Sequence, residues 1–146
     1  MKVTVTSKFL ASTDRVWELL QRSQTLVYVA EGVMTYDGED ELPERWEVGT
    51  EVNLKPRLYG RSQGNHYVQF MEVNPAVRVI ETMEWGGPIT RWNHTMSLIE
   101  VSSNECEYTD AIEIQAGLMT IPVWAFAQFF YRHRHRRWLK LLKEKV

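Results

Sequence analysis

The fold is decided by Gly86-Gly87-Pro88-Ile89-Thr90-Arg91-Trp92-Asn93-His94 and, further along the chain, by Tyr108-Thr109-Asp110-Ala111-Ile112. Both stretches alternate apolar and polar residues, as strands with one buried face do. Between them, Ser102-Ser103-Asn104 has the composition of a turn. We predict an antiparallel hairpin with a three-residue loop, in which Val101 pairs with Glu105.

This register places two ionisable side chains on a face that is otherwise apolar. Residues directly opposite one another share a face of the sheet, and the predicted pairs are Leu98–Tyr108, Met96–Asp110, His94–Ile112 and Trp92–Ile114. His94 and Asp110 are then diagonal neighbours, about 7–8 Å apart at the backbone. Burying either side chain without a partner would cost several kcal/mol. Two interpretations stay open: a hydrogen-bonded structural pair, or an acid–base pair in the wall of a pocket.

The rest of the chain predicts an α+β protein. Alternation and turn residues predict strands at Lys2–Phe9, Thr50–Tyr59, Asn65–Val73, Val77–Trp85, Thr90–Val101 and Glu105–Gln115. Two short helices follow the first strand, one capped by Ser12 and the other spanning Ser23–Ala30 and ended by Gly32. After Pro122 a long helix runs to Leu142. These elements predict a helix-grip pattern, in which a curved antiparallel sheet wraps around the C-terminal helix.

The C-terminal helix carries one charged residue near the middle of its apolar stripe. On a helical wheel the stripe consists of Val123, Trp124, Ala127, Phe130, Tyr131, Trp138, Leu141 and Leu142, and Arg134 lies among them. A buried guanidinium needs a carboxylate, which Asp110, Glu81, Glu72 or an acidic ligand could supply. Alternatively, the Arg134 stem packs on the stripe while its charged end reaches solvent.

Four segments resemble the START/polyketide-cyclase-like (SRPBCC) superfamily, in its ligand-binding, cyclase-like branch. They are Phe9–Trp17, Trp46–Thr50, Gly87-Pro88…Trp92-Asn93-His94 with Thr109–Ile112, and Phe130–Arg134. The resemblance covers nearly the whole chain and implies a single domain over residues 1–146, with a cavity between the sheet and the last helix. One segment departs from the branch: Ala116–Pro122 stands where a Pro-Leu-Gly stretch is often found.

The leading hypothesis is a module that binds a small hydrophobic or aromatic ligand, such as a lipid, in that cavity. We predict that the ligand-binding residues are Trp92, His94, Met96, Tyr108, Asp110, Trp124, Phe130, Tyr131 and Arg134. A second hypothesis is a polyketide cyclase/dehydratase-like enzyme with His94 and Asp110 as the catalytic acid and base. A third is a protein-interaction or co-chaperone-like module, suggested by the outward Phe129 and the acidic segment Glu39–Glu47.

Composition excludes several other classes. The single cysteine, Cys106, cannot form an internal disulfide, and no signal-peptide pattern or membrane-spanning run is visible, so we expect a cytoplasmic protein. The basic residues from Arg132 to Lys145 complement the dipole of the last helix, so we expect no nucleic-acid partner. We expect no metal and no cofactor, since His133 and His135 diverge on their helix and no phosphate-binding loop is present. A homodimer through the exposed helix face stays possible.

Overall fold

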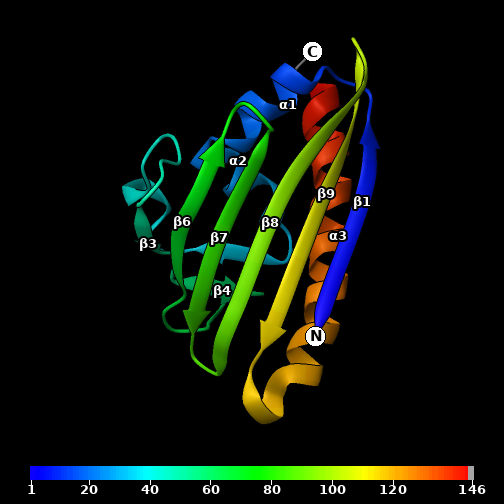
Figure 1. Cartoon of the computed structure of the whole chain (residues 1–146). Coiled ribbons are helices and arrows are strands. Elements are labelled where there is room, and N and C mark those ends of the chain that lie inside the picture. Colours follow the sequence, from blue (N-terminus) through cyan, green and yellow to red (C-terminus); the bar gives the residue numbers. More distant parts are fainter. Residues whose placement is uncertain (145–146) are drawn as a thin grey trace.

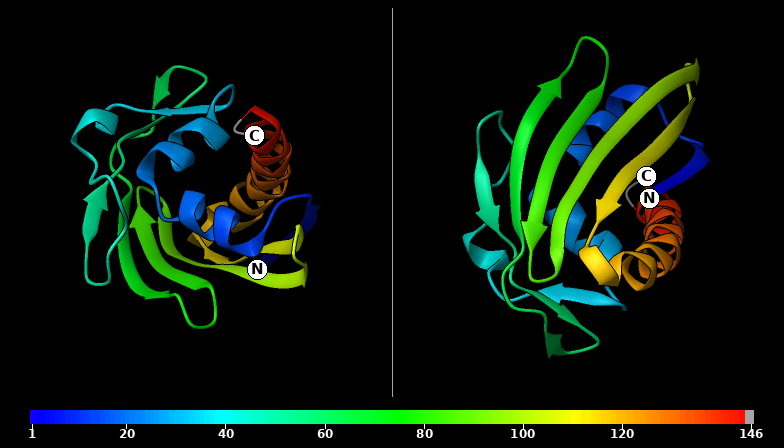
Figure 2. Two further views of the ribbon diagram at one scale, coloured as in Figure 1. Left: turned by 90° about the horizontal axis from the view of Figure 1, so that it is seen from above. Right: turned by 60° about the horizontal axis from the view of Figure 1, so that its bottom comes forward.

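The computed structural model describes residues 1–144, so Lys145, the last cation of the basic run, lies outside the described residues. A six-stranded antiparallel sheet has the order β1-β9-β8-β7-β6-β3 (Figure 1). Its strands are β1 (Lys2–Phe9), β3 (Glu51–Asn53), β6 (Tyr67–Asn74), β7 (Val79–Gly86), β8 (Ile89–Ser102) and β9 (Glu105–Gln115). The helices are α1 (Thr13–Leu20), α2 (Ser23–Ala30) and α3 (Thr120–Glu144). The sheet curves so that α3 lies on its concave side (Figure 2), which confirms the predicted helix-grip fold.

The β8–β9 hairpin has the predicted register but a different loop. Met96 pairs with Asp110 and His94 with Ile112, as the alternation required. The predicted pairing of Val101 with Glu105 is wrong, because Ser102 pairs with Glu105 and the register shifts between Glu100 and Ser102. This bulge at Val101 accommodates one extra residue on β8 and leaves the inner face of the hairpin unchanged.

The predicted strand Thr50–Tyr59 divides into two strands that belong to different sheets. β3 pairs with β6 in the main sheet, whereas β4 (Pro56–Leu58) pairs with β2 (Met34–Tyr36) and β5 (Arg61–Ser62) in a small second sheet. Lys55 separates β3 from β4 and adopts a positive φ of 48°. Pro56 has no backbone N–H, so it cannot continue a ladder of hydrogen bonds. Together these residues turn the chain from one sheet into the other.

The short helices begin and end at the predicted signals. The Ser12 side chain accepts a hydrogen bond from the backbone N–H of Arg15 at the start of α1. Gly32 follows the end of α2 with a φ of +96°, the left-handed conformation that glycine adopts easily. α3 starts at Thr120, preceded by the short 3₁₀ turn η2 (Gly117–Met119), so Pro122 lies in its first turn. A second 3₁₀ turn, η1 (Glu39–Glu41), lies in the acidic loop.

Aromatic rings fill the core around the C-terminal half of α3. Phe9 of β1 stacks on Tyr108 of β9 and on Trp138 of α3, with both ring centroids 5.5 Å away. All three side chains are buried. In the N-terminal half of α3, Val123, Phe126 and Phe130 line the cavity described below. Among residues 1–144, no helix is both long enough and apolar enough to cross a bilayer.

Candidate functional site

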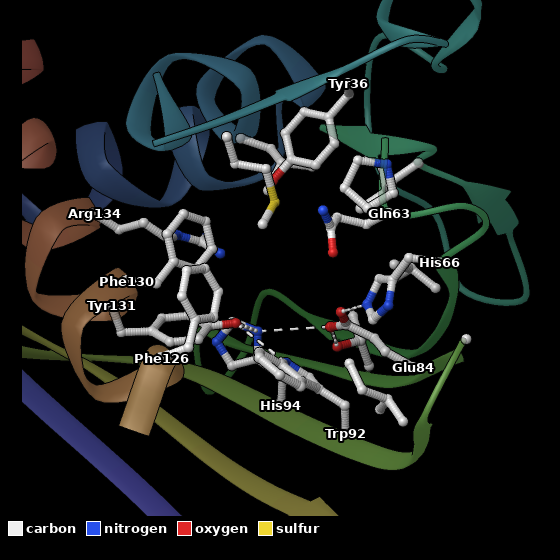
Figure 3. Close-up of a pocket in the computed structure, with 18 of the residues that line it drawn as sticks. Tyr36, Gln63, His66, Glu84, Trp92, His94, Phe126, Phe130, Tyr131 and Arg134 are labelled. Atoms are coloured by element: carbon white, nitrogen blue, oxygen red, sulfur yellow. Dashed lines mark hydrogen bonds and ion pairs between the residues drawn. The ribbon is translucent and has the colours of Figure 1, made fainter. Parts of the chain in front are cut away.

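A cavity of about 380 Å³ lies between the concave face of the sheet, α3 and the α2–β2–β4 region (Figure 3). Its wall is mostly apolar and aromatic. The apolar lining includes Leu20, Leu26, Val29, Met34, Leu54, Leu58, Val68, Phe70, Ile89, Met96, Val123, Phe126 and Phe130. The volume lies within the range of about 300–1,000 Å³ that is usual for sites of drug-sized ligands.

Polar side chains gather on one wall of this cavity, on β7 and β8. Thr82 pairs with His94, and Glu84 pairs with Trp92, so all four side chains share the inner face of the sheet. His66 joins them from the residue just before β6. These positions follow from the pairing of neighbouring antiparallel strands, and they bring two imidazoles and one carboxylate to the same wall.

Gly86 allows His66 to approach this wall. It has a φ of +152°, and a Cβ built on it would lie 2.2 Å from the backbone oxygen of Asn65. Any larger residue would therefore push the Asn65–His66 backbone away from β7. With glycine at this position, His66 Nε2 lies 2.9 Å from Glu84 Oε1.

Asp110 lies directly behind the polar wall, fully buried. Its Oδ1 lies 2.6 Å from His94 Nε2 and accepts a hydrogen bond of 2.7 Å from the Tyr108 hydroxyl. Its Oδ2 lies 2.8 Å from His135 Nε2 on α3. An ionised carboxylate can only accept hydrogen bonds, so both imidazoles donate to it through Nε2. Asp110 therefore fixes the orientation of His94 and ties β8 and β9 to α3.

The contacts of Asp110 determine which nitrogen of each imidazole remains available for other hydrogen bonds. His135 donates through Nε2, and its Nδ1 lies 2.7 Å from the Ser7 hydroxyl. His94 Nδ1 faces the opposite way, 3.5 Å from the Tyr131 hydroxyl and 3.8 Å from Glu84 Oε2. His94 is thus held between two carboxylates, with Nδ1 as its cavity-facing nitrogen (Figure 3).

Burial and charge act in opposite directions on these groups. Burial alone would raise the pKa of Asp110, but the charge of His94 and the hydrogen bonds from His135 and His94 hold it well below its usual range. Burial likewise opposes ionisation of Glu84, yet the hydrogen bond from His66 and the nearby charge of His94 keep its pKa low. Burial would lower the pKa of His94, but the charge of Asp110 and its hydrogen bond raise it. In the polar wall, the carboxylates and the imidazoles therefore stabilise each other's charged forms.

Arg134 enters the cavity from α3, with only 6% of its surface exposed. The alternative in which its charged end reaches solvent is therefore wrong. Its guanidinium carbon lies 4.9 Å from the centre of the Tyr131 ring and 5.8 Å from that of Phe130. Its Nε atom is buried without a hydrogen-bond partner in the described part of the chain.

The carboxylates predicted as partners of Arg134 do not pair with it. Glu81 is exposed, and Glu72 accepts a hydrogen bond from the Asn74 side chain. Asp110 is occupied by its three donors, and within residues 1–144 no carboxylate lies within 4.0 Å of the guanidinium. The described residues therefore supply no carboxylate for Arg134.

The nine predicted ligand-binding residues divide into two groups. Those that line the cavity are Trp92, His94, Met96, Phe130, Tyr131 and Arg134. Tyr108 and Asp110 lie behind the wall, because β9 is covered by α3 at that point. Trp124 faces β1, where its Nε1 donates to the backbone oxygen of Lys2.

Sequence reasoning missed Glu84 altogether and gave His135 no part in the site. A signal for His135 was available, since it lies four residues after Tyr131 and three before Trp138, on the buried stripe. Among residues 1–144, no group of three or more His, Cys, Asp or Glu side chains is arranged to hold a metal ion.

Comparison with known proteins gives a clear result for the fold. No family model and no curated protein matches the sequence. A START superfamily protein from Mycobacterium smegmatis has a similar structure, with a TM-score of 0.72, 14% identity and 99% of each chain covered. A protein from Mesorhizobium loti has a TM-score of 0.75 at 12% identity, covering 100% of this chain and 98% of that one. The chain thus has the helix-grip fold of START proteins, which confirms the resemblance at the level of fold.

An enzyme structure is also similar. Norcoclaurine synthase from Thalictrum flavum, solved in complex with dopamine and hydroxybenzaldehyde, has a TM-score of 0.71 and 14% identity, with 100% of this chain and 88% of that chain covered. One fold therefore spans a START superfamily protein and a synthase, and activity has to be argued from the site.

Proposed function

We propose that this protein binds a small apolar or aromatic molecule in the cavity between the sheet and α3. The observation that carries the proposal is the cavity itself: about 380 Å³, lined mainly by apolar and aromatic side chains, with a few polar groups gathered on one wall. Such a wall orients a ligand while the apolar surface supplies most of the binding free energy. The norcoclaurine synthase complex, in which the same fold holds two aromatic compounds, supports this proposal.

Binding of N-phenyl-1-naphthylamine, a neutral aromatic dye, tests the proposal. We expect its fluorescence to rise on binding. At a hundredfold excess over Kd, the free energy of unfolding should increase by about 2.7 kcal/mol, with a melting temperature several degrees higher.

Two variants of neighbouring residues make this test specific for the cavity. Val123→Trp adds a ring to the lining and should weaken dye binding about tenfold, because it fills the space that the dye needs. Ile121→Trp, at an exposed position of the same helix, should leave binding unchanged. Equal effects of the two substitutions, or no binding by the unmodified protein, would contradict the proposal.

A second candidate function is acid–base catalysis on a carbonyl compound held in the same cavity. One observation favours it: His94 Nδ1 and the Glu84 carboxylate lie 3.8 Å apart and both belong to the cavity wall. Asp110, the other member of the acid–base pair considered from the sequence, orients His94 from behind in this arrangement. A positioned acid–base pair accelerates proton transfer by about 10²–10⁴-fold.

Deuterium exchange into phenylacetone tests this second candidate without knowledge of the natural substrate. In D₂O, a base in the cavity would take a proton from the carbon beside the carbonyl and return a deuteron, which NMR detects. We expect exchange above the buffer rate, reduced at least a hundredfold in Glu84→Gln and in His94→Gln. Melting temperatures of both variants serve as the control for folding. Exchange at the buffer rate in the unmodified protein would exclude this candidate for simple ketones.

A further inference from the structure

The least satisfied group in the cavity is the Arg134 guanidinium. The Arg134 side chain is buried, its Nε has no partner within residues 1–144, and its guanidinium carbon lies over the rings of Tyr131 and Phe130. Figure 3 shows its charged end directed into the cavity. Aromatic faces attract a cation, but they cannot accept the directional hydrogen bonds that five guanidinium N–H groups offer.

The protein's own carboxylates do not satisfy Arg134. Glu84 accepts from the Thr82 hydroxyl at 2.6 Å and from His66 at 2.9 Å, with His94 alongside. Asp110 is held by its three donors behind the wall. Both carboxylates therefore accept hydrogen bonds from imidazoles and hydroxyls and not from Arg134. The guanidinium N–H groups remain available to a molecule inside the cavity.

A second hydrogen-bond donor faces the same space. The Tyr36 hydroxyl of β2 points into the cavity (Figure 3). Burial raises the pKa of Tyr36 to about 12, against the opposing effect of the Arg134 charge, so the hydroxyl stays protonated at neutral pH and can donate. Arg134 from α3 and Tyr36 from β2 thus both offer hydrogens to one region of an otherwise apolar cavity.

We propose that the ligand is a small apolar or aromatic acid whose carboxylate pairs with Arg134. This inference rests on the proposed function and adds the chemical class of the ligand. A planar guanidinium matches a carboxylate in two parallel hydrogen bonds, and in a buried cavity such a pair is stronger than in water. The Glu84 oxygens already accept from Thr82 and His66 and offer no donor to a carboxylate, so the acid end lies toward Arg134 and the apolar body fills the space along Phe126 and Met96.

Competition between two compounds of the same shape tests this assignment. N-phenyl-1-naphthylamine serves as the neutral reporter, and naphthalene-2-carboxylate and naphthalene-2-carboxamide compete with it. We expect the acid to displace the dye at a concentration at least tenfold lower than the amide does. In Arg134→Met, which removes the charge and keeps an apolar stem, the acid should lose at least tenfold in affinity while the amide changes less than twofold.

Three further measurements make the outcome decisive. Arg132→Met, at an exposed position on α3, should leave the preference for the acid intact, and Arg134→Lys should retain part of it. Circular dichroism and melting curves show whether Arg134→Met is folded. If it is not, the inference is judged from Arg134→Lys and from the preference of the unmodified protein for the acid over the amide. Equal affinity for the acid and the amide in the unmodified protein, with the dye bound, overturns the inference and leaves the proposed function standing. Failure of the dye itself to bind overturns both.

Discussion

Replacing Asp110 with alanine is expected to lower the free energy of unfolding by about 3–5 kcal/mol. The reason is the number of partners that lose their acceptor. His94, His135 and the Tyr108 hydroxyl all donate to this one carboxylate, and all are buried. A buried donor left without an acceptor costs about 1–3 kcal/mol, and more when it is charged. Urea unfolding followed by circular dichroism measures the loss.

Two other substitutions separate this effect from a general loss of charge. Asp110→Asn keeps the shape and one accepting oxygen, so a smaller loss of about 1–3 kcal/mol is expected. Glu107→Ala removes a carboxylate three residues away on the outer side of β9 and should change stability by less than about 0.5 kcal/mol. If Asp110→Ala were as stable as Glu107→Ala, the hydrogen-bonded network would contribute nothing to the fold.

The β8–β9 face could be predicted from the sequence because its alternation is strict. Slipping the pairing by one residue would bury Arg91, Glu107 and Glu113, so the register has one acceptable solution. The bulge at Val101 did not disturb this result, since the pairs beyond it keep their partners. His94 and Asp110 were therefore placed on one face correctly, and the structure adds that they are hydrogen-bonded at 2.6 Å.

Glu84 could not be placed in the same way. The turn at Gly87 and Pro88 pairs Gly86 with Ile89, and a regular ladder would then set Glu84 opposite Arg91, on the outer face. The structure instead pairs Glu84 with Trp92, because the register shifts between Glu84 and Gly86. A bulge of this kind reverses which side chains of β7 point inward, and the alternation of residues in the sequence does not predict it. The carboxylate at the cavity wall depends on this single irregularity.

Stability is expected to be highest between about pH 4.5 and pH 6.5, and to fall on both sides. The pKa of Asp110 and that of Glu84 are lowered in the folded protein from ordinary values of 3.8 and 4.5. A lowered pKa contributes stability that is present above the unfolded value and is lost as the pH falls toward the folded value. The two carboxylates therefore make unfolding easier below about pH 4.5.

His94 gives the opposite dependence on the alkaline side. Its pKa is raised from 6.5 in the folded protein, so its contribution is complete below pH 6.5 and is lost as the pH rises through the folded value. The charged and titratable groups around it are Glu84 from β7, Asp110 from β9, Tyr131, Arg134 and His135 from α3, and His66. The free energy of unfolding, measured with urea from pH 3 to pH 9, should therefore decline above neutrality.

The variant His94→Gln identifies the origin of this alkaline decline. Glutamine can still donate to Asp110 but does not titrate, so the slope above pH 6.5 should flatten while the acid slope from Asp110 and Glu84 persists. Slopes are compared because the substitution also changes absolute stability. If the unmodified protein showed no decline between pH 7 and pH 9, His94 would be neutral between its two carboxylates. In that case the cavity wall would carry an uncompensated negative charge, and the carboxylate of an acidic ligand would depend on Arg134 all the more.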